Sequence, residues 1–304
     1  MPSPEAESIV NLYKFIKGTL AKTSQGSFDE IRYMFELNQI LAAEPTDVVY
    51  EEVLCPGTVR PAIWCKPTTA NPGHVILYLH GGGCFAGSPQ SHRKMAAHLA
   101  KAAGAQALLI DFHLAPQFRF PTQIEDAVAT FKWLLGRGIE ARKIVLAGDS
   151  AGGNLAITTT LKLKEEGVGL PGGIVAISPW VDLEATGKSL DSNAQKDVFA
   201  NRGTEAYFSQ LYLDQASPKL PLANPLYADL TGFPPIHVSV GEWEVLLSDS
   251  EALVQRAKQA GVDVTHEVGP EMQHVYQLMA GKAPEADKTI TNMGKWLQAK
   301  VFSL

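Results

Sequence analysis

The chain has 304 residues, of which 45% are hydrophobic and 19% are charged, and its formal net charge at pH 7 is −6. This length allows a large core, arranged as one α/β domain with a small accessory element or at most two domains. The sequence contains no block of lysine and arginine, so we expect neither nucleic acid nor an anionic membrane surface as a partner.

The three cysteines are too few and too irregularly spaced to predict a disulfide framework or a zinc site. The N-terminal residues MPSPEAESIVNLYKF lack the basic region and long apolar region of a signal peptide. The longest apolar runs, such as VILYL at 75–79, have the length of a strand and not of a membrane span. We therefore expect a cytoplasmic globular protein without stable membrane insertion.

The first 45 residues have a helical pattern, and strand patterns begin only after them. From about residue 50 onward, short apolar runs alternate with longer helical patterns, which is typical of a mostly parallel sheet covered by helices. The expected strands are 48–54, 62–67, 74–80, 106–112, 143–149, 173–179, 236–241 and 264–269. The expected helices between and after them are 91–104, 124–138, 152–167, 249–261 and 288–302.

Residues 183–225 interrupt this alternation with polar sequence, several prolines and an aromatic stripe. The stripe consists of Phe199, Tyr207, Phe208 and Tyr212. Insertions at the carboxyl ends of parallel strands build ligand sites in open α/β sheets. Two interpretations stay open: the stripe packs a helix onto the core, or this segment and the N-terminal helices form a lid.

Three consecutive glycines follow the strand pattern that ends at His80. Each glycine costs about 0.5–1 kcal/mol of conformational entropy relative to alanine in a regular element, and a turn seldom needs three. Their N–H groups, unshielded by a Cβ, are suited to an oxygen that gains negative charge during acyl transfer. Gly82 and Gly83, with Gly81 as a further donor, are thus candidates for an oxyanion hole. We expect His80 to anchor this loop through hydrogen bonds rather than to act as a base.

The stretch GDSAGG at 148–153 places Ser150 between glycines two residues before and two residues after it. This spacing is typical of a nucleophile elbow, where a strained turn exposes the serine hydroxyl above the sheet. The N–H of Ala151 would then be another oxyanion donor, and Asp149 would tie the elbow to neighbouring loops. An ordinary tight turn with an incidental serine explains the six residues equally well.

Several motifs together resemble the hormone-sensitive lipase family of α/β-hydrolases. HGGG precedes GDSAGG in the family's order, and DFHLAPQFRFP at 111–121 resembles the family segment D-Y-R-L-A-P-E-x-x-F-P. Further matching landmarks are SPWVDLEATGKS (178–189), NPLYADLTGFPP (224–235) and EMQHVYQL (271–278). The resemblance implies an α/β-hydrolase fold whose mostly parallel central sheet is flanked by helices. Residues 1–45 would form an N-terminal helical cap segment, and 46–304 a catalytic domain with a cap insertion at about 185–215.

In this fold the order along the chain is serine, acid, histidine. His237, His266 and His274 follow Ser150. The first two lie inside strand patterns, whereas His274 lies in a loop after the last strand, where the family has its catalytic histidine. Glu244 matches the family's acid loop through the E-V-L pattern at 244–246, with glutamate in place of the commoner aspartate.

Two neighbouring carboxylates, Glu242 and Asp249, compete with Glu244 for the role of the acid. Asp249 is expected at a helix N-terminus, where an acidic side chain stabilises the first turn. Glu244 is the favoured candidate because of its position in the acid loop.

These residues predict a serine carboxylester hydrolase that forms an acyl-enzyme. Ser150 would attack the ester carbonyl, and His274, oriented by Glu244, would transfer the proton. No metal or organic cofactor is implied. The resemblance implies a preference for short acyl chains, and its E-V-L branch includes hydrolases of lactones and secondary-metabolite esters. The alternatives are a non-catalytic ligand-binding member, as in plant hormone receptors that lack the catalytic histidine, and a peptidase or amidase.

Four aromatic residues near these motifs are candidates to shape a substrate pocket: Phe85, Trp180, Tyr207 and Trp243. Packing in the core explains them equally well. The expected partner is a small-molecule ester. Because members of the family often associate through an edge strand or the terminal helices, a homodimer is a further hypothesis.

Overall fold

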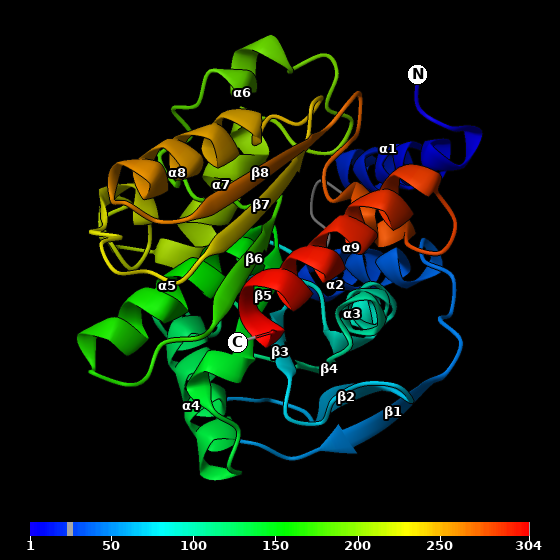
Figure 1. Cartoon of the computed structure of the whole chain (residues 1–304). Coiled ribbons are helices and arrows are strands. Elements are labelled where there is room, and N and C mark those ends of the chain that lie inside the picture. Colours follow the sequence, from blue (N-terminus) through cyan, green and yellow to red (C-terminus); the bar gives the residue numbers. More distant parts are fainter. Residues whose placement is uncertain (23–26, 304) are drawn as a thin grey trace.

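The computed structural model describes residues 1–22 and 27–303. Its centre is an eight-stranded sheet with the order β1-β2-β4-β3-β5-β6-β7-β8 (Figure 1). β1 and β2 pair antiparallel, β2 pairs antiparallel with β4, and the remaining neighbours are parallel. The strands are β1 (Val48–Val53), β2 (Ala62–Pro67), β3 (Val75–Leu79), β4 (Gln106–Leu109), β5 (Ile144–Asp149), β6 (Gly173–Ile177), β7 (Ile236–Gly241) and β8 (Val264–Gly269). All eight predicted strands are present, and the expected mostly parallel central sheet flanked by helices is confirmed.

Helices cover both faces of this sheet (Figure 1). The α-helices are α1 (Glu7–Lys22), α2 (Phe28–Glu36), α3 (Pro89–Ala103), α4 (Thr122–Gly136), α5 (Ala151–Glu165), α6 (Ser189–Ser192), α7 (Arg202–Leu213), α8 (Leu247–Gln259) and α9 (Pro284–Leu297). The shorter helical turns are η1 (Pro4–Ala6), η2 (Leu37–Ile40), η3 (Ala141–Lys143), η4 (Pro225–Tyr227), η5 (Tyr276–Met279) and η6 (Gln298–Phe302). None of the described helices is long and apolar enough to cross a membrane.

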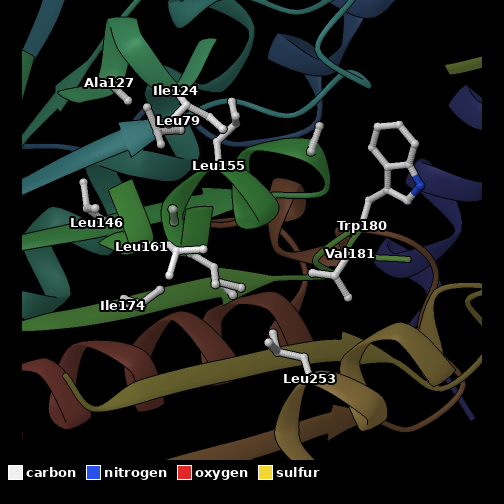
Figure 2. Packing of buried hydrophobic residues seen from close by; sticks show 14 of the residues in the cluster. Leu79, Ile124, Ala127, Leu146, Leu155, Leu161, Ile174, Trp180, Val181 and Leu253 are labelled. Carbon is white, nitrogen blue, oxygen red and sulfur yellow. The ribbon is translucent and has the colours of Figure 1, made fainter. Parts of the chain in front are cut away.

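The alternation of side chains along β3 divides the core into two layers. Leu77 and Leu79 belong to a cluster with residues of α4, α5 and α8, and Figure 2 shows part of this packing. Ile76 and Tyr78 point to the other face, where residues of α1, α3 and α9 cover them. Because both faces are covered, β3 is buried along its whole length, and its sequence is a continuous apolar run rather than an alternating one.

Two segments outside the βα alternation meet over one part of the molecule. The helical segments η1, α1, α2 and η2 precede the first strand, while α6 and α7 lie between β6 and β7. The ring of Phe199, just before α7, lies 4.5 Å from the ring of Tyr13 on α1 and 6.0 Å from that of Phe35 on α2. The N-terminal helices and the inserted segment are therefore packed against each other.

Candidate active site

The turn between β5 and α5 forces Ser150 into an unusual backbone conformation. Its φ is 54° and its ψ is −120°, a region that residues other than glycine rarely adopt and that stores strain. A Cβ on Gly148 would lie 2.4 Å from the carbonyl oxygen of Leu79, and one on Gly152 would lie 1.9 Å from the same oxygen. Only glycine fits at these two positions, as the nucleophile-elbow hypothesis requires.

The glycine loop after β3 leaves backbone donors free beside this turn. Gly82 and Gly83 have φ values of 111° and 63°, and both line a cavity together with Ser150. Ala151 begins α5, so its N–H has no partner within the helix. In the described part of the chain, no acceptor receives a hydrogen bond from any of these three amides.

Asp149 connects the elbow to the glycine loop, as the sequence predicts. Its Oδ1 accepts hydrogen bonds from the Tyr78 hydroxyl at 2.8 Å and from the Gly81 N–H at 3.2 Å. Its Oδ2 lies 3.3 Å from Nε2 of His92 on α3. Burial alone would raise the pKa of Asp149, but His92 and Tyr78 hold that pKa below its ordinary value.

His80 anchors the glycine loop and remains neutral. Its Nδ1 lies 2.8 Å from the carbonyl oxygen of Gly81, and its ring stacks on Phe112 at 4.2 Å. Burial lowers the pKa of His80 to about 4. The buried, neutral imidazole of His80 therefore stabilises the glycine loop and does not transfer protons.

The loop after β8 brings His274 against the carboxylate of Glu244. The Nδ1 atom of His274 donates a hydrogen bond of 2.8 Å to Oε2 of Glu244. The Oε1 atom accepts hydrogen bonds from the Ser178 hydroxyl at 2.6 Å and from the N–H of Gly241 at 2.5 Å. Because Nδ1 carries the donated proton in this contact, Nε2 is the nitrogen left to act on a neighbouring group.

The charge of Glu244 controls the proton affinity of this imidazole. Burial alone would lower the pKa of His274, but the adjacent Glu244 and the hydrogen bond between them raise it to about 9, with Asp197 and Glu205 adding to the effect. Burial also raises the pKa of Glu244, against the opposing effect of His274 and the two other donors. The pair therefore holds one proton firmly. Three donors favour the ionised carboxylate, so we place that proton on the imidazole.

Residues from distant parts of the chain fix the histidine loop. The Tyr13 hydroxyl on α1 donates to the carbonyl oxygen of His274 at 3.0 Å. The ring of Phe199 stacks on the imidazole with a centroid distance of 5.4 Å and an angle of 8°. The N–H of Val275 donates to the Ser178 hydroxyl at 3.2 Å. No local sequence pattern indicates these roles, although Phe199 belongs to the aromatic stripe.

The other two acid candidates have different partners. Asp249, in the first turn of α8, accepts hydrogen bonds from the N–H groups of Val181 and Asp182 at 3.0 and 2.8 Å. Glu242 is exposed and accepts a hydrogen bond from the N–H of Glu271. Asp249 therefore has a structural contact with the chain after β6, and neither carboxylate bonds the imidazole of His274.

A cavity of about 460 Å³, counting its part open to solvent, contains both Ser150 and His274. No described residue forms a hydrogen bond with the Ser150 hydroxyl, which leaves this side chain free to turn toward Nε2. The N-terminal helices and the inserted segment supply much of the wall. The remaining lining residues are Tyr13, Phe35, Asn38, Gly82, Gly83, His92, Asp149, Trp180, Phe199, Glu205, Phe208, Val275 and Leu278.

The four aromatic pocket candidates lie in different surroundings. Trp180 lines the cavity. Phe85 is buried behind it and stacks on Phe208, with ring centroids 5.9 Å apart. Tyr207 is 44% exposed on the outer side of α7. Trp243 lines a separate cavity beside the N-terminal residues. The sequence did not point to Asn38, Phe35 and Glu205, because nothing in their local sequence indicates a site.

Among the described residues, no group of three or more histidine, cysteine, aspartate or glutamate side chains could hold a metal ion. The polar groups of the cavity instead combine a hydroxyl, an imidazole backed by a carboxylate, and three free amides. This set can form a covalent adduct with an electrophilic carbonyl carbon and stabilise the resulting oxyanion.

Comparison with known proteins agrees with this geometry. A family described by the α/β hydrolase fold matches residues 76–278. An acetyl-hydrolase of Streptomyces hygroscopicus is 40% identical over 237 residues, which cover 78% of this chain and 79% of that protein. An ethyl acetate hydrolase of Pseudomonas putida is 29% identical over 284 residues, 89% of each chain. The crystal structure of an esterase from the bacterial hormone-sensitive lipase family superposes with a TM-score of 0.93 and 40% identity, covering 99% of both chains.

The coupling between Glu244 and His274 can be measured by NMR titration of histidine-labelled protein. We expect the His274 imidazole to titrate near pH 9. In Glu244→Gln its midpoint should fall well below the wild-type value, because the negative charge that most strongly opposes the effect of burial is removed. His237, whose pKa burial and His266 lower to about 4, is the internal control and should not move. An unchanged midpoint for His274 would show that Glu244 does not set its proton affinity.

Proposed function

The chain belongs to the hormone-sensitive lipase family of α/β-hydrolases, and on that premise we propose that Ser150, His274 and Glu244 form the catalytic triad with which it hydrolyses carboxylic esters. The observation that carries this proposal is the 2.8 Å hydrogen bond between His274 and Glu244 in the cavity that also contains Ser150. The strained backbone of Ser150 and its glycine neighbours support the role of nucleophile.

The proposed mechanism starts from the neutral imidazole of His274, whose fraction grows as the pH rises toward its pKa of about 9. Oγ of Ser150 then bonds to the ester carbonyl carbon while its proton passes to Nε2 of His274. Glu244 keeps the imidazole oriented and stabilises the imidazolium that results. When the carbonyl π bond opens, its electrons move to the oxygen, which the amides of Gly82, Gly83 and Ala151 would receive. The imidazolium then protonates the departing alcohol. In the second half of the reaction, His274 takes a proton from water while the water oxygen bonds to the acyl carbon. The imidazolium then returns this proton to Oγ of Ser150, the bond between Oγ and the acyl carbon breaks, and the acid is released.

We propose that the acyl group of the substrate is short. The enclosed space beside Ser150 is small, and the rings of Phe35, Phe199 and Phe208 in the wall give the cavity an apolar character. The names of two relatives, an acetyl-hydrolase and an ethyl acetate hydrolase, also favour a small acyl group. A lactone or a secondary-metabolite ester is the second candidate, since a cyclic ester presents the same carbonyl group. The intact His274–Glu244 pair disfavours the ligand-binding alternative.

We further propose that residues 1–45 and about 185–215 act as a cap over residues 46–304. Contacts of Tyr13 and Phe199 with the His274 loop support this role.

β8 lies at the edge of the sheet, and its unpaired backbone groups support a homodimer through this strand, which light scattering would detect. The three free cysteines support a cytoplasmic location. We also propose that the protein acts without stable insertion into a membrane.

Substitutions test the triad on 4-nitrophenyl acetate. We expect Ser150→Ala to lower kcat by about 10⁴-fold or more and Glu244→Ala by about 10³-fold or more, because each removes part of one cooperating unit. Asp249→Ala removes a buried acceptor of two amides, so it should cost about 1–3 kcal/mol of stability while the folded enzyme remains active. Ser192→Ala, at an exposed position, is the matched serine control. An active Ser150→Ala, or loss of turnover with Asp249→Ala alone, would contradict the assignment.

A panel of acyl chains tests the proposed substrate class. The kcat/KM for 4-nitrophenyl acetate and butyrate should exceed that for the dodecanoate at least tenfold, because the enclosed space beside Ser150 is small and a twelve-carbon chain would extend beyond it. γ-Butyrolactone tests the lactone alternative, and its hydrolysis is followed by the release of acid. Fastest turnover of the dodecanoate would contradict a small acyl pocket, and a higher kcat/KM for the lactone than for the acetate would favour the lactone alternative.

A further inference from the structure

The wall of the active-site cavity contains three buried polar side chains that have no hydrogen-bond partner within the described chain. They come from three separate segments: Asn38 from η2, Trp180 from the loop after β6, and Glu205 from α7. Each is at least nine-tenths buried, with exposed fractions of 7%, 2% and 6%. Oδ1 of Asn38 and Nε1 of Trp180 are fully buried and unpaired. The Glu205 carboxyl lines the cavity and makes no hydrogen bond or ion pair with the described residues.

Unpaired groups of this kind are costly, because burial removes them from water without providing a new partner. Glu205 lies in the first turn of α7, where an acidic side chain stabilises the helix. An exposed glutamate would give the same stabilisation without the cost of burial. The side chains of Glu205 and Phe208 are three residues apart, so they face the same side of the helix, and both line the cavity. The helix is therefore oriented so that this carboxyl group faces the reaction chamber.

The surroundings of Glu205 keep its carboxyl group protonated at neutral pH. Burial raises the pKa of Glu205 to about 8, with Asp197 and Glu244 adding to this effect and His274 opposing it. A protonated carboxyl both donates and accepts a hydrogen bond. No lysine or arginine is among the residues that line the cavity, and the imidazole of His274 is already paired with Glu244. An anionic substrate group would therefore find no unpaired positive charge there.

The unpaired atoms in the cavity wall indicate which polar group of a substrate they could bind. The indole N–H of Trp180 needs an acceptor, whereas Oδ1 of Asn38 needs a donor, and Figure 2 shows the Trp180 ring extending away from the aliphatic members of its cluster. A hydroxyl group both donates and accepts, so it can pair with either kind. An ammonium group only donates and would leave the indole unpaired, and a carboxylate only accepts.

We propose that Glu205, with Asn38 and Trp180, forms a polar subsite that binds a hydroxyl group on the ester substrate. This inference rests on the proposed ester hydrolysis, and it narrows the substrate class to esters that carry a hydroxyl on the part that fills the cavity. Such a site discriminates strongly, because an analogue without the hydroxyl leaves buried groups unpaired. Glu205 is a specificity-determining residue in this account, and it takes no part in bond breaking.

Two matched pairs of esters test the subsite and locate the hydroxyl. Ethyl 3-hydroxybutyrate against ethyl butyrate probes the acyl side, and 2-hydroxyethyl acetate against ethyl acetate probes the alcohol side. The readout is the ratio of kcat/KM for the hydroxylated ester to that for its parent, measured by acid release. We expect the ratio to be at least ten for one pair in the wild-type enzyme and to fall below three in Glu205→Leu.

Two further variants control for indirect effects. Glu205→Gln keeps a donor and an acceptor at this position, so its ratio should stay within threefold of the wild-type value. Gln210→Leu introduces the same apolar side chain at an exposed position of α7 and should leave the ratio unchanged. The thermal midpoint of each variant verifies that the protein is folded. If Glu205→Leu does not fold, Asn38→Leu tests the same subsite and should also reduce the ratio.

The outcomes separate this inference from the proposed function. The subsite alone would be overturned if the wild-type enzyme hydrolysed the parent esters and both kcat/KM ratios were near one. The same conclusion would follow if Glu205→Leu kept the wild-type ratio. Wild-type enzyme that hydrolyses none of the four esters would contradict the proposed function itself.

Discussion

The hydrogen bond from His274 to the buried carboxylate of Glu244 is the interaction on which the rest of the site depends. Burying a charged carboxylate is costly unless several donors and an opposite charge compensate it. Here the compensation comes from the Ser178 hydroxyl, the N–H of Gly241 and the imidazole. Ser178 follows β6, Gly241 is the last residue of β7, and His274 lies in the loop after β8. One carboxylate therefore fixes the relative positions of three loops and the orientation of the ring.

The sheet explains why these groups can meet. The parallel strands end at one edge, so the residues that follow them share that edge: Ser150 follows β5, Ser178 follows β6, Glu244 follows β7 and His274 follows β8. The glycine loop follows β3 beside them and is tied to the elbow by Asp149. Side chains from the N-terminal helices and α7 complete the cavity. These capping segments also carry the unpaired polar groups, so selectivity resides on a different part of the chain from the reacting groups.

The sequence predicted the sheet well, because strands that are buried on both faces are continuous apolar runs bounded by turns. It was less accurate at strand ends. The apolar run at 106–112 continues past the end of β4 at Leu109, since the chain leaves the sheet there and Asp111 pairs with Arg60. Local motifs pointed to Ser150 and the glycine loop, whose geometry depends on adjacent residues. Glu205, Asn38 and Tyr13 depend on contacts between distant segments, such as the 261 residues that separate Tyr13 from His274, and no local pattern encodes those. Closeness to a motif in sequence was a poor guide for Tyr207 and Trp243, which lie outside this cavity.

The most direct test of the central claim is a crystal structure of the enzyme after reaction with a small phosphonate ester. The account predicts phosphorus bonded to Oγ of Ser150, Nε2 of His274 within hydrogen-bond reach of the adduct, and the phosphoryl oxygen about 2.7–3.1 Å from the amides of the glycine loop and Ala151. Phosphorus on another residue, or a phosphoryl oxygen that faces away from those amides, would contradict it.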